Sequence, residues 1–243
     1  MDRLLEATPR AERDHFWFRG FRRFVEPLVA AAARGRHLEI LDCGCGTGYN
    51  LPMLRRYGRA TGIDLTWRGL DYAHQSGERR LARATATSLP FPAATFDLVT
   101  SFDVLYAFDD EAERRAIAEM FRVLRPGGRA IVNVAALPAL RGNHSLLSAE
   151  QRRYSRPDLT RALRRGGFQV ERITYTNFTI LPFVAAARLK QRLAGHAASD
   201  AEISVPPAPI NAAFSALLGL EAMALRVINM PVGSSLLALA RRT

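Results

Sequence analysis

The chain has little of what secreted, zinc-binding and membrane-spanning proteins depend on. It has two cysteines, Cys43 and Cys45, and a single C-x-C pair makes neither a disulfide framework nor a complete zinc site. The first residues carry scattered charges and lack the apolar run of a secretory signal. No run of about 18 uninterrupted apolar residues occurs, because three prolines and Asn211 interrupt the nearest candidate, residues 205–220. We therefore expect a cytoplasmic protein with no metal site, and a peripheral membrane contact stays open.

Lysine is almost absent: of the 34 basic residues, Lys190 is the one lysine and the others are arginines. The formal net charge of +11 is compatible with a nucleic-acid partner. However, the arginines are spread along the whole chain, and no RNA-binding aromatic signature or zinc finger accompanies them. Codon bias would produce the same one-sided usage. An anionic substrate or a lipid headgroup fits the charge equally well, so a nucleic-acid partner is not favoured.

Strand-like and helix-like patterns alternate from residue 38 onward. The apolar runs "LEIL", "RATGIDL", "FDLVTSF" and "RAIVNVAAL" are separated by helical patterns, of which "DDEAERRAIAEMFRVLRPGG" begins with acids and stops at Pro-Gly-Gly. A chain of 243 residues suits one domain of this kind. Alternating strands and helices indicate parallel βαβ units in an α/β, doubly wound, Rossmann-like sheet. Ligands of such sheets bind at the carboxyl ends of the strands.

The stretch "LEILDCGCGTGYN", residues 38–50, carries the strongest chemical signal. Its three glycines alternate with other residues after a strand and before a helical pattern, which lets the backbone approach a ligand closely. Asp42 precedes this turn and would repel a pyrophosphate but attract an ammonium or a sulfonium. Asp64 ends the next strand, where an acid can accept hydrogen bonds from ribose hydroxyls. A tight turn without a ligand would explain the glycines but not the two acids.

These motifs resemble those of the class I S-adenosylmethionine-dependent methyltransferases. "ILDCGCGTGYN" is similar to their first motif, "TGIDL" to the second, "LPFPAATFDLVTSFDVLYAF" to the third and fourth, and "RVLRPGGRAIVNV" to the fifth, in order over residues 36–175. The flanks "HFWFRGFRRF" and "HSLLSAEQRRYSRPDLTRALRRGGF" resemble a bacterial subgroup that acts on small molecules. The resemblance implies a seven-stranded sheet with six parallel strands and an antiparallel last strand, S-adenosylmethionine as cofactor and S-adenosylhomocysteine as product.

The resemblance also implies where the cofactor binds. The methionyl part is expected at the first motif, by Asp42, Gly44, Cys45, Gly46 and Gly48. Asp64 is expected to take the ribose, with Leu65 beside the adenine, Ala86 and Thr87 at the adenine edge, and Phe102 and Asp103 closing the site. The family often has an acid near Thr85 for the adenine amino group, and "ARATATSLPF" has none.

Two pieces of the chain lie outside the alternation of strands and helices, and both are too long to be turns. We expect a helical lid segment over residues 1–36, a cofactor-binding core over 37–177, a helical insertion over 178–233 and the last strand over 234–243. The insertion combines long apolar stretches with basic residues at helical spacing. It suits a lid over the acceptor, a dimer face or a pair of helices on a membrane surface.

The catalytic residue is the least determined part of the prediction, because the cofactor already carries the activated methyl group. Our candidates for a base or an orienting group are His144, Tyr154, His15 and Tyr106, and those for contact with the acceptor are Phe16, Trp17, Tyr106 and His144. Each also has a purely structural interpretation as a loop or packing residue. Ala107 stands where related sequences often have a histidine.

These patterns predict methyl transfer to a small apolar or aromatic acceptor by in-line displacement in a water-excluded pocket. Oxygen is the favoured target atom and nitrogen the next. The alternatives are an RNA or other nucleic-acid methyltransferase and a cofactor-binding protein without catalysis. The expected partner is a small-molecule acceptor, and the expected oligomeric state is a monomer or a homodimer.

Overall fold

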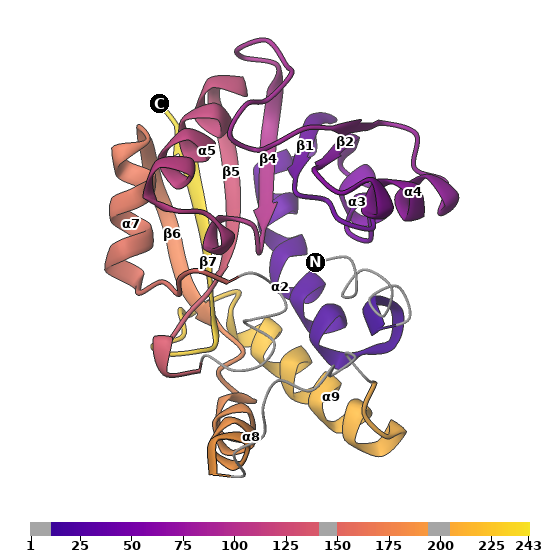
Figure 1. Cartoon of the computed structure of the whole chain (residues 1–243), viewed down its shortest axis with the longest axis vertical. Helices are drawn as coiled ribbons and strands as arrows, with labels where there is room; N and C mark the ends of the chain where they lie inside the picture. The colour runs from indigo at the N-terminus through magenta and orange to yellow at the C-terminus, as the bar shows by residue number, and fades with distance from the viewer. Residues whose placement is uncertain (1–10, 141–149, 194–204) are drawn as a thin grey trace.

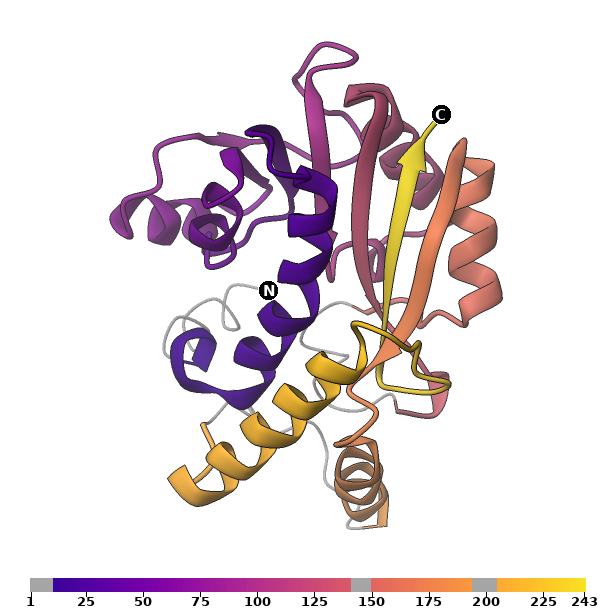
Figure 2. The same ribbon diagram turned by 180° about the vertical axis from the view of Figure 1, so that it is seen from behind.

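The computed structural model describes residues 11–140, 150–193 and 205–243. These residues form a seven-stranded sheet with helices on both faces (Figures 1 and 2). The strands are β1 (Leu38–Cys43), β2 (Gly58–Asp64), β3 (Leu81–Arg83), β4 (Phe96–Phe102), β5 (Leu124–Ala135), β6 (Phe168–Thr176) and β7 (Ser235–Arg242). The helices are α2 (Phe16–Ala33), α3 (Leu51–Arg55), α4 (Trp67–Gln75), α5 (Asp110–Val123), α7 (Arg156–Arg165), α8 (Leu181–Leu193) and α9 (Ala208–Ala224), with the short 3-10 turns η1 (Leu105–Ala107) and η2 (Pro138–Leu140).

The strand order is β3-β2-β1-β4-β5-β7-β6. Strands β3, β2, β1, β4 and β5 pair in parallel, whereas β7 lies between β5 and β6 and is antiparallel to both. This arrangement confirms the predicted Rossmann-like sheet with an antiparallel last strand. In the register, Asp42 of β1 is the partner of both Gly62 and Thr100. The carboxyl ends of β1, β2 and β4 therefore meet at one edge of the sheet.

The central strands are buried on both faces. Ile40 and Leu41 are neighbours in β1 and are both fully buried, one in each of two apolar cores. Helices α2, α3 and α9 contribute to the Ile40 core, and α5 and α7 to the Leu41 core. Burial on both sides explains why these strands are continuous apolar runs without alternation.

The N-terminal segment and the insertion pack against each other (Figure 2). Helix α2 begins after His15 and ends at Arg34, whose φ is 48°. Gly20 permits a close crossing of α2 and α9, because a Cβ there would lie 2.3 Å from Leu218 Cδ1. The predicted helical segment and helical insertion are thus both present. The exact division of the chain into four segments stays a prediction.

One predicted boundary was wrong. The helical pattern that runs to Pro126-Gly127-Gly128 ends as helix α5 at Val123, and strand β5 begins at Leu124. The residue before a proline disfavours helical backbone, and Leu124 pairs with Phe96 of β4. The first residues of β5 therefore include the Pro-Gly-Gly segment at which the helix was expected to stop.

Candidate functional site

The glycine turn follows β1 at the carboxyl edge of the sheet. Gly44, Gly46 and Gly48 all have positive φ, at 81°, 53° and 77°. A Cβ on Gly44 would lie 2.2 Å from Val104 Cγ2, and one on Gly48 would lie 2.7 Å from Ala73 Cβ. A Cβ on Gly46 would meet nothing within 4 Å. The turn thus needs glycine for its conformation at all three positions, and at Gly46 it leaves open space.

Asp42 lies beneath this turn and is 1% exposed. Its Oδ1 accepts a hydrogen bond of 2.6 Å from Thr100 Oγ1. Its Oδ2 is buried and has no hydrogen-bond partner among the described residues. Burial raises the pKa of Asp42 to about 7, the hydroxyl of Thr100 opposes this shift, and the charge of Asp64 adds to it. A buried acceptor oxygen without a donor is costly, so this atom is suited to a donor from a ligand.

Asp64 joins the glycine turn to the loop after β2. Its Oδ2 accepts a hydrogen bond of 2.9 Å from the amide of Gly46, and its Oδ1 accepts bonds from the amide of Thr66 at 2.8 Å and its hydroxyl at 2.6 Å. The carboxylate is half-buried. Each oxygen has further lone pairs, so Asp64 can hold the turn and still accept hydrogen bonds from a ligand.

Two apolar side chains stand open to solvent beside Asp64. Leu65 is 54% exposed and Trp67 is 66% exposed, and the guanidinium of Arg83 lies 5.5 Å from the centroid of the Trp67 ring. Ala86 is buried and Thr87 is half-buried. The hydroxyls of Thr85 and Thr87 lie 2.9 Å apart and bond to each other. An exposed leucine and tryptophan at the end of a strand form an apolar surface on which a planar ring can lie.

The end of β4 adds a second carboxyl group. Asp103 has a φ of 58°, and its backbone amide and its Oδ1 both bond to Asn133, each at 3.0 Å. Asp103 is accessible to solvent, yet enough protein surrounds its carboxyl to raise its pKa to about 7. The Asn133 hydrogen bond and Arg153 oppose this shift, and Glu150 adds to it. Phe102 is buried and packs edge-on against Phe21 at 5.0 Å between ring centroids.

Comparison with known protein families gives a match over the residues of this site. Residues 41–132 match the family described as "Methyltransferase domain", and this stretch holds Asp42, the glycine turn, Asp64 and Asp103. The chain thus carries a methyltransferase domain, and its relatives and fold support a class I S-adenosylmethionine-dependent methyltransferase.

Curated relatives of this methyltransferase align over part of their length. A protein of Mycolicibacterium smegmatis named "Probable S-adenosylmethionine-dependent methyltransferase/" is 29% identical over 68% of this chain and 64% of its own length. "O-methyltransferase resE" of Aspergillus sclerotiorum is 30% identical over 63% of this chain and 62% of its own. "Phosphatidylethanolamine N-methyltransferase" of Cereibacter sphaeroides is 34% identical over 43% and 54%. The chain thus spans less than two thirds of each of these relatives.

Solved structures show the same fold. A "S-adenosylmethionine dependent methyltransferase from Mesorhizobium loti" superimposes with a TM-score of 0.58 at 21% identity, over 89% of this chain and 96% of the other. At this identity the likeness concerns the fold alone.

The side chains at this edge fit the family's cofactor. The unpartnered Asp42 oxygen and the accessible Asp103 carboxyl are acceptors suited to an ammonium group, and Asp64 is an acceptor suited to ribose hydroxyls. Cys45 and Cys43 are free and buried, and burial raises the pKa of both thiols. Cys45 therefore lies in the turn as an uncharged thiol.

The aromatic N-terminal segment lies close to the glycine turn. Thr47 of the glycine turn donates a hydrogen bond of 2.6 Å to Glu12. Arg22 of α2 lies 4.1 Å from the ring centroid of Tyr49 and also donates to its hydroxyl. Sequence reasoning missed these contacts and Asn133. The polar Asn133 in the apolar run "RAIVNVAAL" is a signal that would have found one of them.

Two of the predicted catalytic residues have hydrogen-bond partners within the protein. His15 is the N-cap of α2: its Nδ1 accepts from the amide of Trp17 at 3.1 Å, and burial lowers its pKa. Tyr154 is buried and donates to Glu113 and to the carbonyl of Leu105. Its hydroxyl is therefore already bonded within the protein, and burial raises its pKa. The catalytic roles of both residues stay predictions.

The remaining candidates lie in different settings. Tyr106 is half-buried in η1, and its carbonyl accepts from the amides of Gln151 and Arg152. Phe16 is buried and packs against Phe214 of α9 at 4.9 Å between ring centroids. Trp17 is half-buried on the same core. His144 lies outside the described residues.

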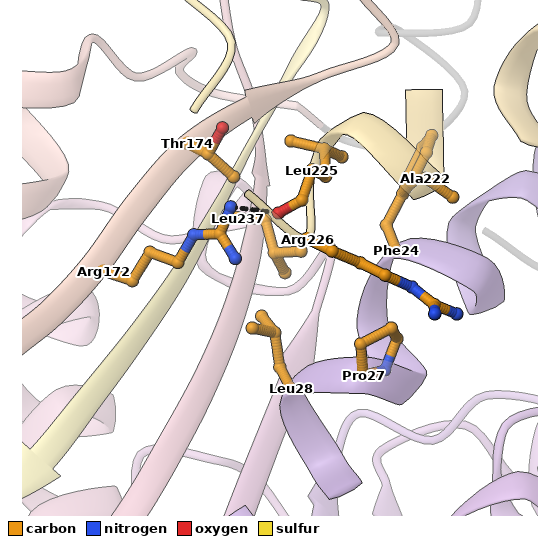
Figure 3. Close-up of a pocket in the computed structure, with 9 residues that line it drawn as sticks. All are labelled: Phe24, Pro27, Leu28, Arg172, Thr174, Ala222, Leu225, Arg226 and Leu237. Atoms are coloured by element: carbon orange, nitrogen blue, oxygen red, sulfur yellow. Dashed lines mark hydrogen bonds between the residues drawn. The ribbon is translucent and has the colours of Figure 1, made fainter. Parts of the chain in front are cut away.

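A pocket is present elsewhere on the molecule. It lies between helix α2, the end of helix α9 and strands β6 and β7 (Figure 3). Its lining contains none of the predicted site residues.

Proposed function

We propose that this chain transfers a methyl group from S-adenosylmethionine to a small apolar or aromatic acceptor, with oxygen as the favoured target atom and nitrogen the next. The observation that carries the proposal is the buried, unpartnered oxygen of Asp42 beneath a turn of three left-handed glycines. Two relatives support oxygen and nitrogen as target atoms, since one is named an O-methyltransferase and another a phosphatidylethanolamine N-methyltransferase.

We assign the cofactor contacts from the same side chains. Asp42 and Asp103 face the methionyl ammonium, with Phe102 closing that end, and the turn of Gly44, Cys45, Gly46 and Gly48 receives the methionyl chain. Asp64 accepts from the ribose hydroxyls. The exposed side chain of Leu65 lies against the adenine, with Ala86 and Thr87 at its edge. The positions of these residues at one end of β1, β2 and β4 support the assignment.

When bound, S-adenosylmethionine supplies a methyl group that is already activated on a sulfonium. The protein must therefore align an acceptor atom and exclude water. We assign the wall of the acceptor site to the aromatic residues Phe16, Trp17 and Tyr106. Phe16 and Phe214 hold this wall against α9, and the Phe21 and Phe102 pair forms its base. An apolar lining of this kind favours an apolar acceptor.

The reaction is tested by incubating the purified protein with S-adenosylmethionine and a panel of phenols, carboxylic acids, amines and phospholipid extracts. Release of S-adenosylhomocysteine is followed by chromatography. We expect release above the acceptor-free rate with at least one apolar acceptor, and methylated product in the same reaction. Cofactor binding without release for any acceptor would favour the non-catalytic alternative.

His144 is our candidate for the base that takes the acceptor proton. Substituting His144→Ala should lower the rate with a hydroxyl acceptor by about a hundredfold and leave cofactor affinity unchanged, because this histidine is outside the cofactor-binding set. His37→Ala is the matched control, since His37 is exposed between α2 and β1. Equal rates for the two variants would remove His144 from the mechanism.

A further inference from the structure

Helix α9 turns its polar side chains toward the protein. Its sequence contains three of them, Asn211, Ser215 and Glu221. Glu221 is 1% exposed, and its carboxylate accepts from the amides of Phe178 and Thr179 at 3.0 Å and 2.9 Å and from the hydroxyl of Thr179 at 2.8 Å. The one acid of the helix is therefore withdrawn from the surface.

The other two polar side chains also face inward. Asn211 accepts from the amide of Phe16 and donates to the carbonyl of Asp14, each at 2.8 Å. Ser215 is buried, and its carbonyl accepts from Arg23 of α2 at 2.7 Å. Helix α9 is thus fixed to α2 and to the turn after β6 through its polar face.

The opposite face of α9 is apolar and exposed. Leu220 is 59% exposed, Met223 is 58% exposed and Val227, one turn on, is 85% exposed. Ile228 beside them is also exposed. We call this set, together with the exposed alanines at helical spacing before it, the α9 outer face: Ala212, Ala213, Ala216, Leu220, Met223, Val227 and Ile228. A helix on a water-facing surface has the reverse polarity, with its apolar stripe inward.

The end of the α9 outer face is rigidly held. Arg172 of β6 donates to the carbonyl of Leu225 (Figure 3). It also donates to the carbonyl of Ile228 and, through Nε, to Asn229 at 2.8 Å. A guanidinium on the last carbonyls satisfies and anchors the helix end. Val227 and Ile228 therefore project from a fixed turn and not from a loose chain end.

Arginines flank the α9 outer face. Arg19 and Arg23 are exposed and one turn apart on α2, and Arg23 reaches the α9 backbone at Ser215. Arg226 is exposed at the end of α9 and lies near Pro27 of α2, one turn beyond Arg23 (Figure 3). Exposed apolar side chains beside a row of cations match the boundary between acyl chains and anionic headgroups.

We propose that the α9 outer face, with Arg19, Arg23 and Arg226, docks on an anionic phospholipid surface. A second copy of this chain is a poorer occupant, because a two-fold interface sets each surface patch against itself. With the two α9 helices antiparallel, such an interface would bring the arginine rows together, and Glu221, the acid of α9, is buried and offers them no counter-charge. No helix within the described parts of the chain has the length and apolarity to cross a bilayer.

Vesicle co-sedimentation of the full chain tests the proposal. We expect the chain to bind vesicles of equal parts phosphatidylcholine and phosphatidylglycerol. Binding to vesicles of phosphatidylcholine alone should be at least about tenfold weaker. Added salt should weaken binding to the vesicles that contain phosphatidylglycerol. The double variant Leu220→Glu with Val227→Glu should lose at least about tenfold in binding. Arg19→Gln with Arg226→Gln should lose most of the preference for phosphatidylglycerol.

The matched control is Ala118→Glu with Gln169→Glu, which makes the same charge change at exposed positions of α5 and β6. It should bind vesicles within about twofold of the unmodified chain. Circular dichroism and thermal unfolding establish that each variant is folded. Equal loss in this control and in the α9 variant would overturn the proposal, as would equal binding to the two vesicle types. A dimer in light scattering that the α9 variant dissociates would also overturn it, in favour of a second copy.

Discussion

Asp64→Ala is expected to weaken S-adenosylmethionine binding by about 1–3 kcal/mol, or roughly fivefold to 150-fold. The variant loses the acceptor assigned to the ribose hydroxyls. It also loses the acceptor of the Gly46 amide, so the glycine turn is less firmly held in its binding conformation. Isothermal titration calorimetry of the purified variant measures the effect directly.

Asp71→Ala is the control for Asp64→Ala. Asp71 is an exposed carboxylate of α4 that bonds to Gln75, so its removal makes the same change in net charge and leaves the hydrogen bond between Asp64 and Gly46 in place. We expect its affinity to equal that of the unmodified chain. Unchanged affinity in Asp64→Ala would remove Asp64 from the cofactor site and leave it a purely structural residue of the turn.

Asp103→Asn is expected to weaken cofactor binding by about 1.5–3 kcal/mol, the worth of a hydrogen bond to a charged group. Asparagine has the same shape and tolerates the left-handed backbone at this position. It can also keep the hydrogen bond from Asn133. The substitution therefore removes the charge that we assign to the methionyl ammonium and little else.

The pH dependence of binding separates this role from a structural one. The pKa values of Asp42 and Asp103 are both raised to about 7, and a cationic group favours the ionised form of each. Affinity should therefore rise between about pH 6 and about pH 8, as protons leave both groups. In Asp103→Asn the rise should shrink to the part due to Asp42. A variant with an unchanged pH profile would show that Asp103 does not face the ammonium.

The sequence predicted the features of the fold and of the site that depend on local residue patterns. Strand β4 matches the predicted run "FDLVTSF" end for end, because most of its residues are buried and suit a strand in the middle of the sheet. The glycine turn lay between a strand and a helix as predicted, because three glycines tolerate positive φ where other residues do not. Asp42 and Asp64 met at one edge because parallel strands end together.

The sequence did not predict what depends on distant pairing. The unpartnered oxygen of Asp42 follows from its position opposite Thr100, 58 residues away. The hydrogen bond between Asn133 and Asp103 likewise follows from the pairing of β4 with β5. The sequence also did not show that α9 has its polar side chains inward and its apolar side chains outward. Glu221 is buried because it bonds to the turn at Thr179, 42 residues before it. These features need the tertiary contacts that bring the partners together.

Native mass spectrometry of the purified chain, before and after addition of S-adenosylmethionine, tests the central claim most directly. The account predicts one bound cofactor or its demethylated product per chain, and loss of that adduct in Asp64→Ala while Asp71→Ala keeps it. A chain that binds no cofactor under these conditions and retains RNA instead would contradict the assignment of the glycine turn.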